Sequence, residues 1–448
     1  MTDRLVVIGG DAGGMSAAAQ ARRLRPDLEI VVFERGEFTS YAACGLPYFV
    51  GGEVTDRDRL VARTPEEFRT QGIDVRTRHE VTAVDTAART VEVRPLDAGG
   101  TTTEPYGELL IATGASPVKP PLPGIDGPGV FDLRTIPDAD AVRAAIDAGA
   151  RRAVVIGGGY IGVEVAEAFA ARGLEVTLVE LADQPMLTLD ADMAGLVTTA
   201  LEELGVKVLL GTGVTGFVHE GGRLTAVDTT AGEIPADLSV VGLGVRANSA
   251  LAAAAGIPVG ASGGIVVDDR LHTEVDGVWA AGDCVESRHR ITGERVVIAL
   301  GTHANKQGRV VGSNIGGTPA TFGGVLGTAI TKVGSTEVGR TGLSEREAAA
   351  AGLDAFAVTA RAAVRAHYYP GADPIAVKLV VERGTGRLLG GQIAGGSGSA
   401  KRIDVVATAL WNDMDVRDVA GMDLAYAPPF SPVWDPVLVA AGKAALQL

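Results

Sequence analysis

Two kinds of residue in this sequence could carry out chemistry: a cysteine thiol, and the glycine-rich turns that precede and follow it. Cys44 lies in the segment from Thr39 to Tyr48, which is rich in small residues. A thiolate can carry a mixed disulfide or a persulfide, or be oxidised to a sulfenic acid. Cysteine is also a common buried core residue, so Cys44 taken alone leaves a structural role open.

The second glycine-rich turn has all three positions of the dinucleotide-binding fingerprint. Gly157, Gly159 and Gly162 serve the tight turn, the approach of pyrophosphate and the packing of helix on strand. Glu180 ends the next apolar run, where a carboxylate binds both ribose hydroxyls of NADH and repels the 2′-phosphate of NADPH. The next residue is Leu181 rather than an arginine, so we predict a preference for NADH over NADPH.

The first glycine-rich turn departs from the fingerprint at one place. Gly9 and Gly14 fill the first and third positions, but the middle position is Asp11. A carboxylate beside a pyrophosphate is unfavourable unless it points away. Glu34 stands where a ribose-binding acid is expected. The pattern predicts a second dinucleotide site, and its alternative is a strand-to-helix turn of any α/β protein.

Each turn is predicted to lie inside a strand–helix–strand unit. The expected elements are strands over 4–9 and 29–34 around a helix over 15–24, and strands over 153–157 and 175–180 around a helix over 160–172. Two such βαβ units predict two nucleotide-binding modules. The proline-rich piece over 117–124 is predicted to connect them. No dinucleotide pattern follows residue 325, where we predict a third domain with a strand over 376–381.

Composition narrows the class of protein. A chain of 448 residues has room for two or three domains, and its net charge of −15 argues against nucleic acid as a partner. Two cysteines do not make a disulfide framework. The N-terminal sequence enters a strand without a signal-peptide pattern, and no apolar stretch reaches the roughly 18 residues of a membrane span. We therefore expect a cytoplasmic protein with no membrane partner and no metal site.

A resemblance covers the whole chain. Ser40-x-x-x-Cys44 followed by Gly45-Leu46-Pro47-Tyr48 resembles the single-cysteine branch of the pyridine nucleotide–disulfide oxidoreductases, which contains coenzyme A-disulfide reductase, NADH oxidase and NADH peroxidase. The segments over 110–114 and 273–283 are similar to FAD motifs of the same flavoproteins. The resemblance implies bound FAD, a nicotinamide coenzyme and a homodimer.

The implied fold class is α/β, with two Rossmann-like domains and a C-terminal α+β dimerisation domain. We expect a discontinuous FAD domain over 1–118 and 248–324, an NAD(H) domain inserted over 119–247 and the dimerisation domain over 325–448.

The resemblance also makes Cys44 the redox centre. In the two-cysteine branch a partner cysteine lies five residues further on, where this chain has Phe49. The partner of Cys44 is therefore expected to be an external sulfur or oxygen. Cys284, which follows Asp283, is predicted to be a packing residue.

Three features place the chain nearest to coenzyme A-disulfide reductase. The catalytic histidine of the oxidases and peroxidases is replaced by Ala12. The segments Tyr368-Tyr369-Pro370-Gly371 and Tyr426-Ala427-Pro428-Pro429 match that reductase. By resemblance, Tyr368 and Tyr426 reach Cys44 of the other subunit, where a phenol can protonate a leaving thiolate. The alternative is that both tyrosines only pack in a proline-rich turn.

The remaining site residues are implied by the same resemblance. Substrate contacts are expected from Ser16, Gln20, Arg23 and Ser40, while Ala43 and Trp434 replace an asparagine and a lysine of the family. Tyr160 is expected to gate the nicotinamide side of the flavin, and Glu164 to position the nicotinamide. The expected cofactor contacts are Gly9, Asp11, Ala12, Gly13, Gly14, Glu34, Arg35, Ser40, Cys44, Val81, Thr113, Gly114, Gly157, Gly159, Tyr160, Ile161, Gly162, Glu164, Glu180, Gly244, Gly282, Asp283, Leu300 and Thr302.

The main hypothesis is an FAD- and NADH-dependent disulfide reductase in which Cys44 forms a mixed disulfide with the thiol of the substrate. Coenzyme A is one candidate for that thiol. Alternatives within the enzymes are an NADH oxidase, with Cys44 as sulfenic acid, and a persulfide or polysulfide reductase. A hypothesis of another class is an NADH-responsive redox-sensing flavoprotein that acts by binding a partner.

Overall fold

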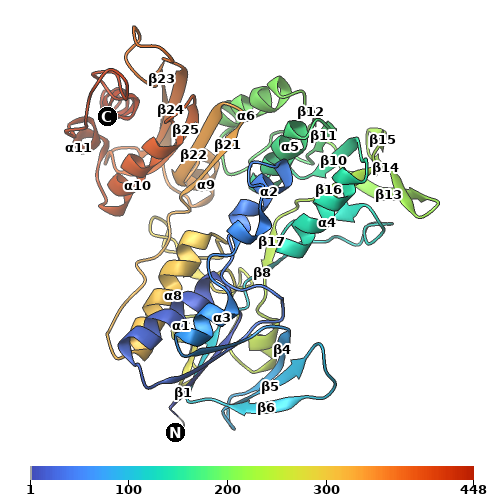
Figure 1. Cartoon of the computed structure of the whole chain (residues 1–448). Coiled ribbons are helices and arrows are strands. Elements are labelled where there is room, and N and C mark those ends of the chain that lie inside the picture. The colour runs from blue at the N-terminus through green and yellow to red at the C-terminus, as the bar shows by residue number, and fades with distance from the viewer. Residues whose placement is uncertain (1–2) are drawn as a thin grey trace.

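A computed structural model describes residues 3–448, and its first sheet is built from two distant parts of the chain (Figure 1). The strand order is β18-β7-β1-β2-β3, and every neighbouring pair is parallel. The strands are β1 (Arg4–Ile8), β2 (Glu29–Phe33), β3 (Ile73–Arg76), β7 (Glu108–Ile111) and β18 (Val278–Ala280). Because β18 returns after the whole second module, the first domain is discontinuous, as predicted.

The first sheet is covered by helices and by the antiparallel strands over 79–105, so its strands are buried on both sides. All five residues of β1 are buried, which explains its unbroken apolar run. Helix α1 (Ala12–Leu24) packs against α8 (Gly301–Ile315). A side chain on Gly308 or Gly312 would overlap the α1 backbone at Gly13 O or Ala17 O, so these glycines set the spacing of the two helices.

Helix α1 begins earlier than the sequence pattern predicted. The expected start was Met15, whereas the helix begins at Ala12 and includes Gly13 and Gly14. The glycines that looked like turn residues form the first helical turn because the helix must approach the strand closely there.

The second module repeats this arrangement. Its sheet has the order β12-β11-β10-β16-β9, again with parallel neighbours only. The elements are β9 (Val130–Phe131), β10 (Arg152–Ile156), β11 (Glu175–Val179), β12 (Lys207–Leu209), β16 (Leu238–Val241), α4 (Ile136–Asp147), α5 (Tyr160–Ala171) and α6 (Ala191–Glu203). Two short antiparallel strands, β8 (Ala115–Pro117) and β17 (Val245–Ala247), join this inserted module to the first.

The C-terminal domain is an antiparallel sheet with helices. The strand order is β21-β22-β25-β24-β23. Its elements are β21 (Ala329–Val333), β22 (Thr336–Gly342), β23 (Ala355–Ala363), β24 (Pro374–Glu382), β25 (Leu388–Gly395), α9 (Glu345–Ala350), α10 (Ile403–Trp411), α11 (Val416–Ala420) and α12 (Pro436–Ala445).

Smaller elements complete the fold. They are α2 (Leu46–Gly51), α3 (Pro65–Thr70), α7 (Ala250–Ala254), the meander β4 (His79–Asp85), β5 (Thr90–Pro95) and β6 (Thr102–Pro105), the meander β13 (Val214–Glu220), β14 (Arg223–Thr229) and β15 (Gly232–Pro235), the pair β19 (Ser287–Arg288) and β20 (Arg295–Val296), and 3-10 turns over Ala43–Gly45, Arg57–Leu60 and Ala400–Arg402. Among residues 3–448, no helix combines the length and apolar character that a bilayer crossing requires. The predicted fold class is confirmed, and the residue boundaries assigned to its domains stay a prediction.

A buried lysine joins the C-terminal domain to the second module. Lys378 on β24 is only 5% exposed. Its ammonium lies 3.3 Å from Asp190, 2.7 Å from Asp192 and 2.5 Å from Glu345. Asp190 also accepts a hydrogen bond from Gln392 at 2.6 Å. One cation therefore balances carboxylates from both domains.

Replacing Lys378 with methionine should lower the free energy of unfolding by about 3 kcal/mol at neutral pH, because the buried carboxylate of Asp190 loses its cation while Asp192 and Glu345 remain exposed to solvent. The loss should shrink as the pH falls, since protonation removes the uncompensated negative charge. Thermal unfolding at neutral pH and at about pH 5 measures both effects. Lys401→Met, at an exposed pair with Asp404, is the matched control. Equal stability of the two variants would contradict the role given to Lys378.

Candidate active site

The two glycine-rich turns have the same geometry. Gly9 and Gly157 have φ angles of +108° and +95°. A side chain on Gly9 would collide with the carbonyl of Ala112, and one on Gly157 with the carbonyl of Gly242. Each of these carbonyls directly follows a neighbouring strand of the sheet. A side chain on Gly14 or Gly162 would overlap the carbonyl oxygen of Gly9 or Gly157, respectively. Each helix therefore starts against the end of its strand, with its N-terminal amides available to an anion.

The middle positions of the two turns differ. A Cβ built on Gly159 meets no protein atom within 4 Å, which leaves room for a pyrophosphate to approach. At the matching place in the first turn, Asp11 Oδ1 accepts a hydrogen bond from the Tyr41 N–H at 3.2 Å. Burial raises the pKa of Asp11 to about 6, partly offset by Arg134. The carboxylate is thus directed to the Cys44 loop.

The two predicted ribose-binding acids are held alike. Glu34 accepts hydrogen bonds from Gly10 N at 2.7 Å and Gly36 N at 2.6 Å. Glu180 accepts from Gly158 N at 2.6 Å and Ala182 N at 2.8 Å. Each acid is thereby fixed at the mouth of its own glycine-rich turn. The exposed residue Arg35 follows the first acid, as Leu181 follows the second.

Cys44 lies where the first module meets the second. It is in the 3-10 turn over Ala43–Gly45, directly before α2, and its side chain is exposed. Leu46, Phe49 and Val50 of α2 are buried in a core formed mainly by the second module. The apolar face of α2 therefore anchors a first-module segment on the inserted domain and leaves the thiol free at its start.

Charged groups from four places surround the Cys44 thiol. Its pKa is raised above the usual value, first by partial burial and then by Glu164, with smaller contributions from Asp283 and Asp11. Arg134 acts in the opposite direction. This environment favours the protonated thiol of Cys44 over its thiolate. Among the groups around the sulfur, the cation of Arg134 is the one that stabilises the thiolate.

Arg134 was missed by the sequence reasoning. Its guanidinium donates to Asp283 Oδ2 at 3.1 Å and to the Ala115 carbonyl at 3.2 Å. Asp283 follows β18 in the first domain, whereas Arg134 precedes α4 in the inserted one. No local motif marks this arginine, because only the packing of the two modules brings it to the site. Burial raises the pKa of Asp283 against the effect of Arg134.

Glu164 and Tyr160 lie in the first turns of α5 and face the C-terminal domain. Glu164 Oε1 accepts a hydrogen bond from the Thr331 hydroxyl of β21 at 2.8 Å. Burial raises the pKa of Glu164 and also that of Tyr160. The buried Tyr160 hydroxyl lies beside Thr188. All three domains thus contribute to the surroundings of Cys44.

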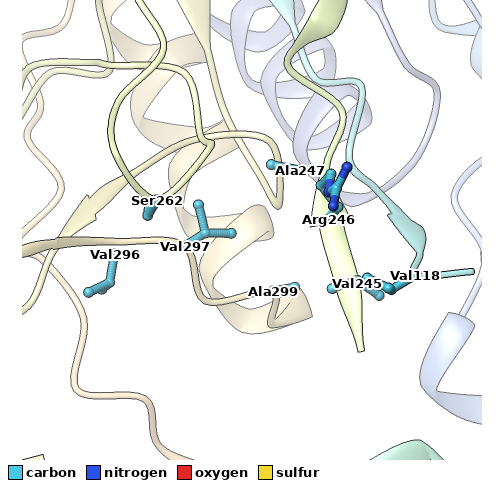
Figure 2. Close-up of a pocket in the computed structure, with 8 residues that line it drawn as sticks. All are labelled: Val118, Val245, Arg246, Ala247, Ser262, Val296, Val297 and Ala299. Carbon is cyan, nitrogen blue, oxygen red and sulfur yellow. The ribbon is translucent and has the colours of Figure 1, made fainter. Parts of the chain in front are cut away.

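A cavity of about 460 Å³ opens beside the strands that connect the two modules (Figure 2). Its walls are mainly apolar: Val118, Val245, Arg246, Ala247, Ser262, Val296, Val297 and Ala299. It adjoins the predicted contacts Gly244, which precedes Val245, and Leu300, which follows Ala299. A mainly apolar cavity that adjoins two predicted cofactor contacts is a candidate for the site of a flat ring system.

The other predicted cofactor contacts are spread over both modules. Thr113 donates its hydroxyl hydrogen to the Asn248 carbonyl at 2.6 Å, and Gly282 N donates to Gln307 Oε1 at 2.7 Å. Gly114, Gly244 and Gly282 all have positive φ angles, which glycine adopts without strain.

Gly13 packs on the Ala281 carbonyl, and Val81 is buried in β4. Ala12 starts α1, Ile161 is exposed on α5, and Thr302 is exposed on α8.

The predicted substrate contacts of α1 lie along its seam with α8. Ser16 donates to Asn305 at 2.8 Å, Gln20 to Ser313 at 3.1 Å, and Arg23 to Gln20 at 2.9 Å. The three side chains therefore share one helix face, as the spacing predicted. Ser40, the fourth, has a φ of +49° and precedes Tyr41 in the Cys44 loop.

Tyr368 lies between β23 and β24 and Tyr426 between α11 and α12. These elements of the C-terminal domain lie apart from α2 of the same chain (Figure 1). Tyr368 is 66% exposed and Tyr426 is 45% exposed. A hydrogen bond between them raises the pKa of Tyr426. Cys284, by contrast, is buried, with its thiol directed to the carbonyls of Ala281 and Ile111.

Known proteins with this sequence pattern are oxidoreductases. Residues 3–308 match the pyridine nucleotide-disulphide oxidoreductase family, and residues 328–436 match its dimerisation domain. A Pyrococcus horikoshii protein named NAD(P)H coenzyme A polysulfide/persulfide reductase is 41% identical over 98% of both chains. A Staphylococcus aureus coenzyme A disulfide reductase is 31% identical over 96% of both.

A solved structure shows the same fold over almost the whole chain. The structure titled NAD-dependent persulfide reductase from A. fulgidus superposes with a TM-score of 0.96 at 42% identity, covering 99% of this chain and 83% of that one. With two domain matches and a whole-length relative, the chain belongs to the pyridine nucleotide-disulphide oxidoreductase family, whose members use FAD and NAD(P)H.

Proposed function

We propose that this chain is an FAD-dependent NAD(P)H:disulfide oxidoreductase, most like coenzyme A-disulfide reductase. The observation that carries the proposal is the exposed thiol of Cys44 at the junction of the two dinucleotide modules, with Phe49 where a second redox cysteine would stand. The other cysteine, Cys284, is buried in the core. Cys44 therefore exchanges with an external sulfur.

The proposed reaction balances as NADH + H⁺ + RSSR → NAD⁺ + 2 RSH. The Cys44 thiolate attacks one sulfur of RSSR, which forms Cys44–S–S–R and releases one RS⁻. Two electrons from NADH then cleave this mixed disulfide, which releases the second RS⁻ and restores the Cys44 thiolate. FAD, when bound, accepts the hydride from the nicotinamide and supplies those two electrons.

Cofactor binding is assigned to the residues of the two glycine-rich turns. The α1 turn with Glu34 and Asp283 would hold FAD, and the α5 turn with Glu180 would hold NADH. The ion pair from Arg134 orients Asp283 and keeps the inserted module against the first. Glu164, anchored by Thr331, would position the nicotinamide, and Tyr160 would cover its side of the flavin.

Protonation of the leaving thiolate is assigned to the partner subunit. The C-terminal domain is the family's dimerisation domain, so the exposed pair Tyr368 and Tyr426 belongs to a surface that meets a second copy. A tyrosine phenol is protonated at neutral pH even without the hydrogen bond from Tyr368 that raises the pKa of Tyr426, so this pair can donate a proton. In the dimer this pair would reach Cys44 of the other chain.

The substrate class is an organic disulfide or persulfide, with coenzyme A as the thiol that fits best. The relatives named for coenzyme A disulfide and for coenzyme A persulfide are both similar over the whole chain. Ser16, Gln20 and Arg23 form a polar row on α1, and the exposed Arg23 can meet a phosphate. Reduction of a persulfide RSSH by the same site would release RSH and H₂S.

Cys44→Ser should abolish disulfide and persulfide reduction, with a loss of roughly a thousandfold or more, because the nucleophile is removed. Reduction of the bound flavin by NADH in a stopped-flow experiment should persist. Cys284→Ser is the matched control and should keep turnover.

Mass spectrometry of the isolated protein tests the substrate, since a Cys44 adduct of coenzyme A mass is expected. Turnover with oxygen alone would instead favour the oxidase.

Coenzyme preference can be tested at Leu181, which is 74% exposed beside Glu180. Leu181→Arg places a cation where the 2′-phosphate of NADPH would lie, so the ratio of kcat/KM for NADPH over NADH should rise about tenfold. Leu96→Arg, at an exposed leucine outside the second module, controls for the added charge. A wild-type enzyme that prefers NADPH would contradict the assignment of Glu180.

The assignment of tyrosine to the partner subunit predicts complementation. Cys44→Ser and Tyr368→Phe/Tyr426→Phe homodimers should both have low turnover. Exchange of their subunits creates hybrids with one intact site, so a mixture should recover about a quarter of wild-type activity. If the tyrosines acted within their own chain, every hybrid site would contain a defect and mixing would restore nothing.

A further inference from the structure

The side chain of Asp11 makes an unusual hydrogen bond for its position. It is the N-cap residue of α1, a position where aspartate commonly accepts a hydrogen bond from the amide of the second or third helical residue. Here it makes no such cap bond. Its Oδ1 instead accepts the Tyr41 N–H at 3.2 Å, from a loop thirty residues further along the chain.

A second hydrogen bond joins the same turn to the same loop. Ser40 N donates to the Gly10 carbonyl at 2.9 Å. Ser40 has a φ of +49°, a left-handed conformation that is unfavourable for a residue with a side chain. On the loop's other side, Ala42 N donates to Leu60 O and Ala62 N donates to Ser40 O, both at 2.8 Å. The loop is therefore held from two sides just before Cys44.

Asp11 also belongs to the charged surroundings of the thiol. The charged groups that face Asp11 are Arg134 and Glu34, with the Tyr41 phenol nearby. Those that face Cys44 are Glu164, Arg134, Asp283 and Asp11. With a pKa raised to about 6, Asp11 is ionised at neutral pH and then disfavours the Cys44 thiolate.

We infer that Asp11, in place of the middle glycine of the first turn, is a positioning residue for the redox cysteine. Its carboxylate holds the Cys44 loop on the glycine-rich turn through the Tyr41 N–H and places a negative charge near the thiol. The inference rests on the proposed function only in taking Cys44 as the redox centre.

Two variants separate the hydrogen bond from the charge. Asp11→Asn keeps an oxygen that can accept from the Tyr41 N–H but removes the charge, whereas Asp11→Ala removes both. The FAD-loaded dimers are alkylated with iodoacetamide over a range of pH, and modification of Cys44 is followed by mass spectrometry. Turnover with NADH and coenzyme A disulfide is expressed per bound FAD.

Asp11→Asn should alkylate about two- to fivefold faster than wild type at neutral pH, because loss of a nearby negative charge lowers the pKa of the thiol. Glu164→Gln should show the larger acceleration, since Glu164 acts more strongly on Cys44. Glu92→Gln, at an exposed site on β5, should show none. Asp11→Ala should alkylate faster as well but turn over about tenfold more slowly than Asp11→Asn, because its loop is released.

An unchanged alkylation rate in Asp11→Asn would overturn the electrostatic role, and equal turnover of Asp11→Asn and Asp11→Ala would overturn the positioning role. The alkylation assay does not depend on catalysis. If Cys44→Ser kept full disulfide reductase activity, the proposed function would fail while the alkylation result for Asp11 still stood.

Discussion

Both dinucleotide modules depend on the same close approach of a helix start to the end of a strand. At Gly14 against Gly9, and at Gly162 against Gly157, there is no space for even one side-chain carbon. This contact aims the amides of each helix N-terminus at a point beyond the sheet, where an anion is stabilised. The strand that follows each helix ends at the same edge of its sheet as the glycine-rich turn. Glu34 and Glu180, which follow these strands, therefore accept hydrogen bonds from Gly10 N and Gly158 N of their own turns.

Everything near Cys44 follows from how the two repeats are joined. The inserted module enters and leaves through β8 and β17, and α2 buries its apolar face on that module. The thiol therefore lies between domains rather than within one. Arg134 and Asp283 meet across the same boundary, and Glu164 is fixed by Thr331 of the C-terminal domain. The electrostatic state of one sulfur thus depends on residues from all three domains.

The first turn shows how a family pattern can tolerate a misplaced charge. An aspartate at the position of the middle glycine would oppose a pyrophosphate if it pointed at the ligand. In this fold its carboxylate accepts a hydrogen bond from the Tyr41 N–H instead. The substitution is therefore compatible with a dinucleotide site and links the cofactor turn to the loop that carries the thiol.

The amino-acid pattern and its family resemblance predicted the repeated βαβ units, the discontinuous first domain, the two acids at the strand ends and a Cys44 that lacks a second cysteine nearby in the chain. Such features are local, because glycine spacing, apolar runs and turn residues act over a few positions. Helix α1 begins three residues before its predicted start at Met15, because Gly13 and Gly14 belong to the helix rather than to the turn. Three contacts could be found only in the folded chain: the hydrogen bond of Asp11 to the Tyr41 amide, the ion pair of Arg134 with Asp283 and the hydrogen bond of Glu164 with Thr331. These contacts join residues far apart in the chain, and their energy comes from domain packing and long-range charge, which no local pattern encodes.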